Sequence, residues 1–88
     1  MSKPVLFFAN LCPDTAPFVA ELARLKVDYE SVEIMSSMAN FKRFLTLRDQ
    51  HPAFEQAKEN GYIGIPALLW ADDEQVVLDI NQLKDIFG

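Results

Sequence analysis

The sequence PVLFFANLCPDTAP, residues 4–17, contains the strongest indications of the fold. It opens with an apolar run, residues 5–9, whose length and composition are typical of a buried strand. Residues 13–26 then follow the spacing of an amphipathic helix, and Pro13 suits its first turn because no N–H donor is needed there. The apolar face of this helix consists of Phe18, Leu22 and Leu25. The stretch therefore predicts a strand that leads through a short turn into a helix, with Cys12 at the junction.

The rest of the chain predicts further strands and helices. Residues 28–34 alternate imperfectly between apolar and polar side chains, as expected of a half-buried strand. His51 and Pro52 separate two helices, because proline disfavours helical geometry in the residue before it. Asn81 is the expected N-cap of the last helix. The expected elements are strands at residues 28–34, 67–71 and 75–78, and helices at residues 38–50, 53–59 and 81–87.

The order of these elements predicts the fold class. The first strand, the helix after it and the second strand form a βαβ unit, so these two strands should be parallel. Residues 67–78 form a hairpin that should lie antiparallel to this unit, in the order second, first, third and fourth strand. Helices should cover both faces. This β-α-β-α-β-β-α arrangement around a four-stranded mixed sheet is the plan of the thioredoxin fold, in the α/β class.

Length and composition limit the classes of function. With 88 residues the chain is expected to form one domain, residues 1–88, and to be a monomer. The formal charge of -5, from 13 acidic and 8 basic residues, argues against nucleic acid or an anionic membrane as a partner. One cysteine and one histidine cannot form an internal disulfide or a structural zinc site, and no bound cofactor is expected. Without a signal-peptide pattern or a membrane-spanning apolar stretch, we expect the protein in the reducing cytoplasm.

Cys12 is the candidate reactive group. Its place between a strand and a helix N-terminus would bring it close to unpaired backbone amides and to the positive end of the helix dipole. Both favour the thiolate, which is the nucleophilic form of cysteine. The alternative is that Cys12 is a small buried hydrophobe, as free cysteines commonly are.

Two short motifs resemble those of glutaredoxins. CPDT, residues 12–15, follows the first strand, where glutaredoxins carry Cys-Pro-x-Cys, and GIP, residues 64–66, precedes the third strand. The pair is similar to small bacterial glutaredoxin-related proteins that carry a Cys-Pro-Asp-Cys motif and a Gly-Ile-Pro segment. The similarity extends in element order over nearly the whole chain. It implies a cis peptide bond before Pro66 that faces Cys12, whereas a trans proline at the start of an ordinary edge strand is the alternative.

The resemblance implies a monothiol thiol–disulfide oxidoreductase with glutathione as co-substrate. The Cys12 thiolate would attack a glutathione mixed disulfide, become glutathionylated, and be released by a second glutathione. Thr15 replaces the second cysteine, which excludes resolution by a dithiol within the chain. Its hydroxyl would bond either the thiolate or the backbone at the helix start. The implied catalytic residues are Cys12 and Thr15, and the implied contacts to glutathione or to a protein mixed disulfide are Pro13, Asp14, Ile65, Pro66 and Asp79.

The chain also departs from the glutaredoxin pattern. The basic residue usual before the cysteine is missing from residues 9–11, and Asp14 adds a negative charge that disfavours a thiolate. The usual Gly-Gly turn before the last helix is absent, so Asp79 or Asn81 would have to supply that contact. Basic residues of the second helix would either meet a glutathione carboxylate or form a solvated polar face; these are Lys42, Arg43 and Arg48. The departures leave a second function open, that of a non-catalytic thioredoxin-fold protein that binds a partner.

Overall fold

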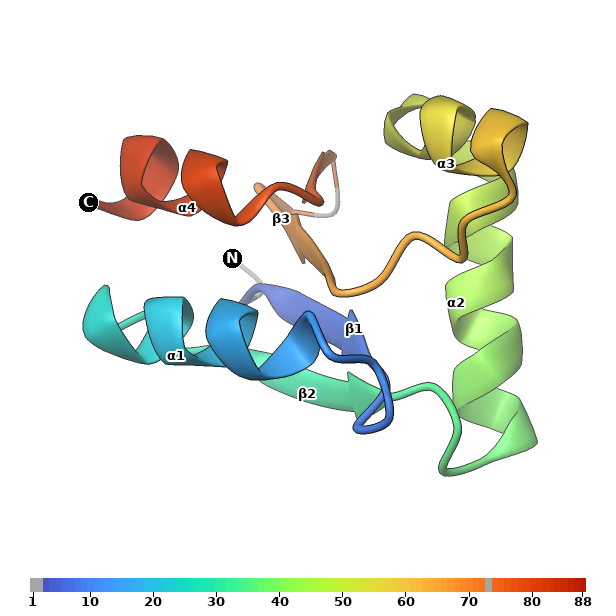
Figure 1. The fold of residues 1–88 in the computed structure, drawn as a ribbon, viewed down its shortest axis with the longest axis horizontal. Coiled ribbons are helices and arrows are strands. Elements are labelled where there is room, and N and C mark those ends of the chain that lie inside the picture. The colour runs from blue at the N-terminus through green and yellow to red at the C-terminus, as the bar shows by residue number, and fades with distance from the viewer. Residues whose placement is uncertain (1–2, 73) are drawn as a thin grey trace.

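The computed structural model describes residues 3–72 and 74–88, and a mixed four-stranded sheet forms its centre (Figure 1). The strands are β1 (Val5–Phe8), β2 (Glu30–Glu33), β3 (Ala67–Trp70) and β4 (Gln75–Val77). They lie in the order β2-β1-β3-β4, with β1 parallel to β2 and β3 antiparallel to both β1 and β4. The predicted α/β class, strand order and strand directions are therefore confirmed.

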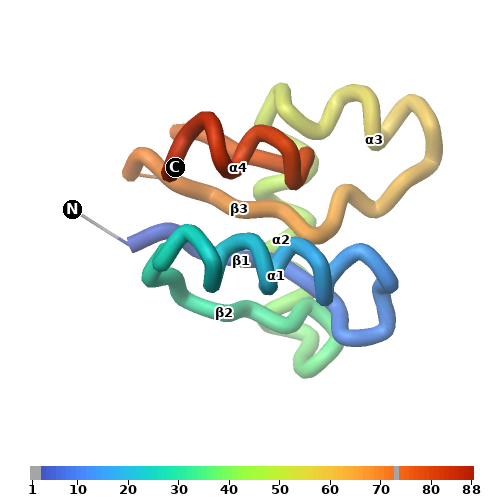
Figure 2. The backbone as a smooth tube through the Cα atoms, turned by 60° about the vertical axis from the view of Figure 1, so that its left-hand side comes forward, coloured from blue at the N-terminus to red at the C-terminus, as the bar shows by residue number. Residues whose placement is uncertain are grey.

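Helices cover both faces of the sheet. In Figure 2, α1 and α4 lie in front of the strands, and α2 lies behind them. The short 3-10 helix η1 follows α2 and leads into α3. The bounds are α1 (Thr15–Arg24), α2 (Met38–Gln50), η1 (Pro52–Phe54), α3 (Glu55–Asn60) and α4 (Ile80–Phe87). Among the residues that the structure describes, no helix is both long enough and apolar enough to cross a bilayer.

Strand β1 is packed from both sides, because successive side chains of a strand point to opposite faces. Phe7 belongs to the core under α2, where its ring centre lies 5.7 Å from that of Phe44. Phe44 in turn lies 5.8 Å from Phe54, edge to face. Leu6 belongs to the core under α1 and α4, with Phe18, Leu22, Leu68, Val77 and Leu83. Strand β1 is therefore fixed by packing on both faces, and the turn that follows it begins at this fixed strand.

Among the helix boundaries that differ from the prediction, two concern the predicted site. Helix α1 begins at Thr15 and not at residue 13, because the preceding residues form a turn in which the Thr15 N–H donates to the Cys12 carbonyl at 3.1 Å. Helix α4 begins at Ile80, and Asp79 is its N-cap: the Asp79 carboxylate accepts the N–H of Asn81 at 2.9 Å. The prediction that Asn81 caps this helix is wrong, since the extended backbone that an N-cap requires is found at Asp79.

Candidate functional site

Cys12 lies in the turn between β1 and α1. Its N–H donates to the Ala9 carbonyl at 3.0 Å. Asp14 is the N-cap residue of α1, so Cys12 precedes the first helical residue, Thr15, by a short turn. The thiol is therefore farther from the positive end of the α1 dipole than the sequence predicted. The effect of a helix dipole falls off beyond the first turn of the helix. The side chain is half-buried and packs against the core under α2.

A segment remote in sequence meets this thiol. The peptide bond between Ile65 and Pro66 is cis, as the resemblance to glutaredoxins implied. The Sγ of Cys12 lies 3.9 Å from the carbonyl oxygen of Ile65, where the thiol can donate a weak hydrogen bond. Pro66 is buried and Ile65 is half-buried. The structure thus brings together Cys12, Ile65 and Pro66, which the sequence placed in one site.

Thr15 does not donate a hydrogen bond to Cys12. Its hydroxyl donates to the Ala9 carbonyl at 2.8 Å, and the residue is only 7% exposed. A hydroxyl has a single hydrogen, so of the two roles expected from the sequence the structure contains the backbone contact. The Ala9 carbonyl accepts both the Cys12 N–H and the Thr15 hydroxyl, and these two contacts fix the turn.

A Thr15→Val variant is expected to lower the free energy of unfolding by about 1 kcal/mol, because valine keeps the shape of threonine but removes a buried hydrogen bond. Urea unfolding followed by circular dichroism measures the change. The matched control is Thr46→Val, since the exposed Thr46 hydroxyl donates to the Lys42 carbonyl of its own helix at 3.0 Å. The control should change stability by less than about 0.5 kcal/mol. Equal effects of the two substitutions would show that the Ala9 contact does not hold the turn.

Two grooves meet at Cys12. The loop groove, between the Cys12 turn and residues 56–66, has a volume of about 820 Å³. The helix groove, between α1 and the strands β1 and β2, has a volume of about 580 Å³. Of the residues predicted for the site, Asp14, Ile65 and Pro66 line the loop groove, whereas Pro13 and Thr15 line the helix groove. Cys12 lines both, so a molecule in either groove lies beside this residue.

The apolar wall of the loop groove was missed in the sequence. It consists of Leu11, Met35, Tyr62 and Ile63, whose exposed fractions are 89%, 61%, 67% and 58%. Tyr62 and Ile63 form an apolar pair between two glycines, in a stretch that has neither a helical nor a strand pattern. An apolar pair in such a loop was the available signal, because loops that do not pack a core are usually polar.

The loop that carries Tyr62 and Ile63 is held by α2. The Arg48 guanidinium donates from Nε to the Ile63 carbonyl at 2.8 Å and from Nη2 to the Tyr62 carbonyl at 2.7 Å. Gly64 has φ +94°, and a Cβ there would lie 2.8 Å from the Phe54 ring, so the loop also lies directly on the core. Arg48 is therefore a residue that shapes the groove, and it does not project into solvent as a free charge.

Two other expected contacts to glutathione lie elsewhere. Asp79 caps α4 and lines neither groove, so its predicted place in the site is not observed. Arg43 pairs with Glu30 at 3.0 Å and lies over the ring of Phe7, 5.6 Å from its centre. Within the described ranges, no lysine or arginine lines the loop groove or the helix groove. Asp14 is the charged residue that lines the loop groove.

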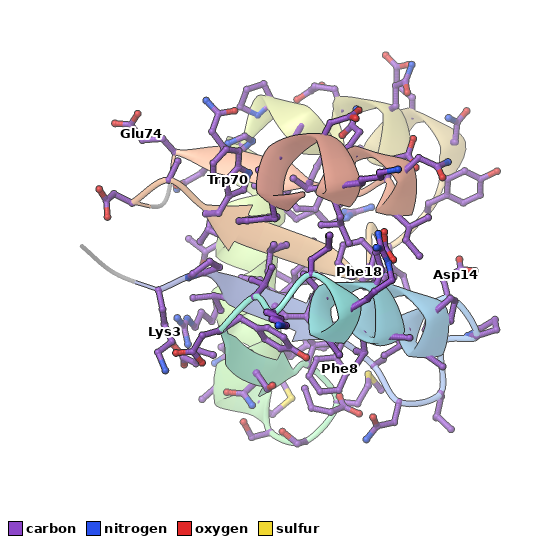
Figure 3. All side chains as sticks on the ribbon, turned by 90° about the vertical axis from the view of Figure 1, so that its left-hand side faces the viewer. Lys3, Phe8, Asp14, Phe18, Trp70 and Glu74 are labelled. Atoms are coloured by element: carbon purple, nitrogen blue, oxygen red, sulfur yellow. The ribbon has the colours of Figure 1, made fainter. Side chains whose placement is uncertain are left out.

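His51 lies at the opposite end of the molecule. Its Nε2 is 3.0 Å from the Glu74 carbonyl oxygen, and its Nδ1 accepts the N–H of Ala53 at 3.1 Å. Figure 3 shows Glu74 and Asp14 at opposite ends of the fold. The prediction that His51 is a helix-boundary residue is confirmed, and the ring is too remote to act as a base for Cys12.

A charged pair on the outer surface of α1 has shifted pKa values. Arg24 donates from Nε and Nη2 to the Glu21 carboxylate at 2.7 and 2.8 Å. These hydrogen bonds lower the pKa of Glu21 and raise that of Arg24. Neither side chain lines a groove at Cys12, so the pair contributes to the helix and not to the site.

Across the part of the chain that the structure describes, no group of three or more potential metal ligands occurs.

Comparison with known proteins identifies a relative. No protein-family model matches the chain, and no solved structure matches it. A protein of Haemophilus influenzae, described as an uncharacterized protein, is 61% identical over 87 residues, which cover 99% of this chain and 100% of the relative. The chain belongs to the same family as this Haemophilus influenzae protein.

Proposed function

We propose that this protein is a glutaredoxin-like monothiol thiol–disulfide oxidoreductase with a thioredoxin fold, which reduces glutathione mixed disulfides in the cytoplasm. The observation that supports the proposal most is the 3.9 Å contact between the Cys12 Sγ and the carbonyl oxygen of Ile65, beside the cis bond to Pro66. The contact places a half-exposed thiol where two grooves meet. The strand order β2-β1-β3-β4, with helices on both faces, agrees with the proposed fold.

The proposed reaction proceeds by two thiol–disulfide exchanges at Cys12. The Cys12 thiolate attacks the glutathione sulfur of a mixed disulfide R–S–S–G. A disulfide forms between Cys12 and glutathione, and R–S⁻ leaves with the electron pair and takes a proton from solvent. A glutathione thiolate then attacks the glutathione sulfur of this intermediate, which releases oxidised glutathione and the Cys12 thiolate. In sum, R–S–S–G and GSH give RSH and GSSG, and no second sulfur of the chain is needed.

A non-catalytic binding protein is the second candidate. It is favoured by the charges at the site: the carboxylate of Asp14 lines the loop groove, and no lysine or arginine of the described chain lines either groove. A thiolate at Cys12 thus gains no cationic neighbour from the groove walls. Under this alternative the grooves bind a partner, and Cys12 performs no exchange.

A glutathione-coupled assay tests the proposal. The reduced protein is mixed with glutathione and the mixed disulfide of glutathione with 2-mercaptoethanol, and oxidised glutathione is followed through glutathione reductase and NADPH. The expected result is a rate that rises in proportion to protein concentration, with a glutathione adduct on Cys12 in the mass spectrum. A rate equal to that without protein, together with Cys12 alkylation no faster than that of free glutathione, would exclude the enzyme and leave the binding protein.

A further inference from the structure

We infer that the loop groove binds an extended apolar segment, uncharged or cationic, of the polypeptide whose glutathionylated cysteine is reduced through Cys12. This inference rests on the function proposed above and specifies its substrate class. In this view the protein recognises the polypeptide half of the mixed disulfide, and glutathione is the small thiol that is exchanged.

The apolar wall of the loop groove is the first observation. Leu11, Met35, Tyr62 and Ile63 each expose more than half of their surface to solvent, and all four line one groove that Cys12 also lines. Apolar side chains gathered in this way on a small protein commonly mark a binding surface. The volume of about 820 Å³ is in the range that a short peptide segment or a medium-sized ligand fills.

The charges around the groove select the kind of ligand. Among the described residues that line the loop groove, Asp14 is the charged one. Arg48 lies beside the groove, and its Nε and Nη2 donate to the carbonyls of the loop. Glutathione carries two carboxylates at neutral pH, and these lining residues offer no cation to pair with them. A polypeptide segment has a neutral main chain, and a lysine or arginine on it can pair with Asp14. The lining thus disfavours an acidic ligand and favours an apolar segment with a positive charge.

Neutral polar groups that line the loop groove suit a peptide backbone. Gln56 and Asn60 line the loop groove from α3, and both are exposed. Their side-chain amides each offer a donor and an acceptor, which is the combination that peptide N–H and C=O groups require. Apolar side chains of the segment would contact Tyr62 and Ile63, while its main chain faces these amides.

Matched glutathionylated peptides test the inference. The first peptide has leucine and valine on both sides of a central cysteine and a lysine at one end. The second replaces leucine and valine with serine, and the third replaces lysine with glutamate. We expect the first to be deglutathionylated about tenfold faster than the second and faster than the third, because two apolar side chains are buried and Asp14 is paired. The Ile63→Ser variant should reduce this preference. The matched control Met38→Ser should keep it, since Met38 is 68% exposed and lines neither groove.

The affinity of the same peptides with serine in place of cysteine, measured by fluorescence anisotropy, separates recognition from chemistry. If the protein exchanges no disulfide at all, the proposed enzyme fails, and preferential binding of the apolar peptide still supports the groove assignment. Equal affinities and equal rates for the three peptides would overturn the inference while leaving the enzyme intact. A dimer that dissociates in Ile63→Ser would also overturn it, because the groove would then be covered by a second copy of the chain.

Discussion

A Cys12→Ser variant is expected to lose all glutathione-dependent turnover and to fall to the rate of the reaction without protein. Serine keeps the shape of the side chain and its place beside the Ile65 carbonyl. Its hydroxyl is not ionised near neutral pH and cannot form a disulfide, so neither exchange step can occur. The effect is expected to be complete because the chain contains no other cysteine.

Initial rates at several protein concentrations measure this loss, and thermal unfolding by circular dichroism shows whether the variant folds. Met38→Ser is the matched control, because it removes a sulfur-containing side chain that is 68% exposed and outside both grooves. The control should keep the full rate. Turnover that persists in a folded Cys12→Ser protein would contradict the proposed function, since the reaction would then not pass through this sulfur.

The Phe44→Ala variant is expected to lose about 3–5 kcal/mol of the free energy of unfolding. Phe44 is 1% exposed and contacts the rings of Phe7 and Phe54 at 5.7 and 5.8 Å between centres. Truncation removes the apolar surface of one ring and leaves a cavity between the two others. Small domains have a total stability of about 5–15 kcal/mol, so the variant should be close to unfolding.

Urea unfolding measures the loss, and the melting temperature should fall by at least about 12 °C. Phe44→Leu fills most of the space and should cost less than half as much as alanine. Met38→Ala, on the exposed surface of the same helix, should have a small effect, within about 0.5 kcal/mol. If Phe44→Ala unfolds at the urea concentration of the native protein, the packing of α2 on β1 does not determine stability.

Much of the fold was predictable because local patterns specify it. The apolar run at residues 5–9 is typical of a buried strand, and β1 lies there. The helix predicted at residues 53–59 is followed by Gly61, which forms the left-handed C-cap of α3 with φ 74°. The cis bond before Pro66 was predicted differently: it came from the resemblance to a family, and no pattern in the residues themselves specified it.

The parts of the site that depend on tertiary geometry were not predictable. The acceptor of the Thr15 hydroxyl is the carbonyl of Ala9, which comes within reach only after the turn has folded. Asp79 and Asn81 are both good N-caps by type, and the backbone at residue 79 decides between them. Arg48 reaches carbonyls 14 and 15 residues away, so its role depends on how α2 packs beside the loop.

The guanidinium of Arg48 ties the Ile63 carbonyl to α2, whereas the Ala9 carbonyl, just after β1, holds the backbone of Cys12. In the proposed enzyme, the loop and its arginine would govern substrate preference, and the Ile65 carbonyl would be the point where this loop meets the reactive sulfur. A side-chain change at Ile63 would then alter substrate preference in the proposed enzyme, while the main-chain contact between Cys12 and Ala9 stays in place.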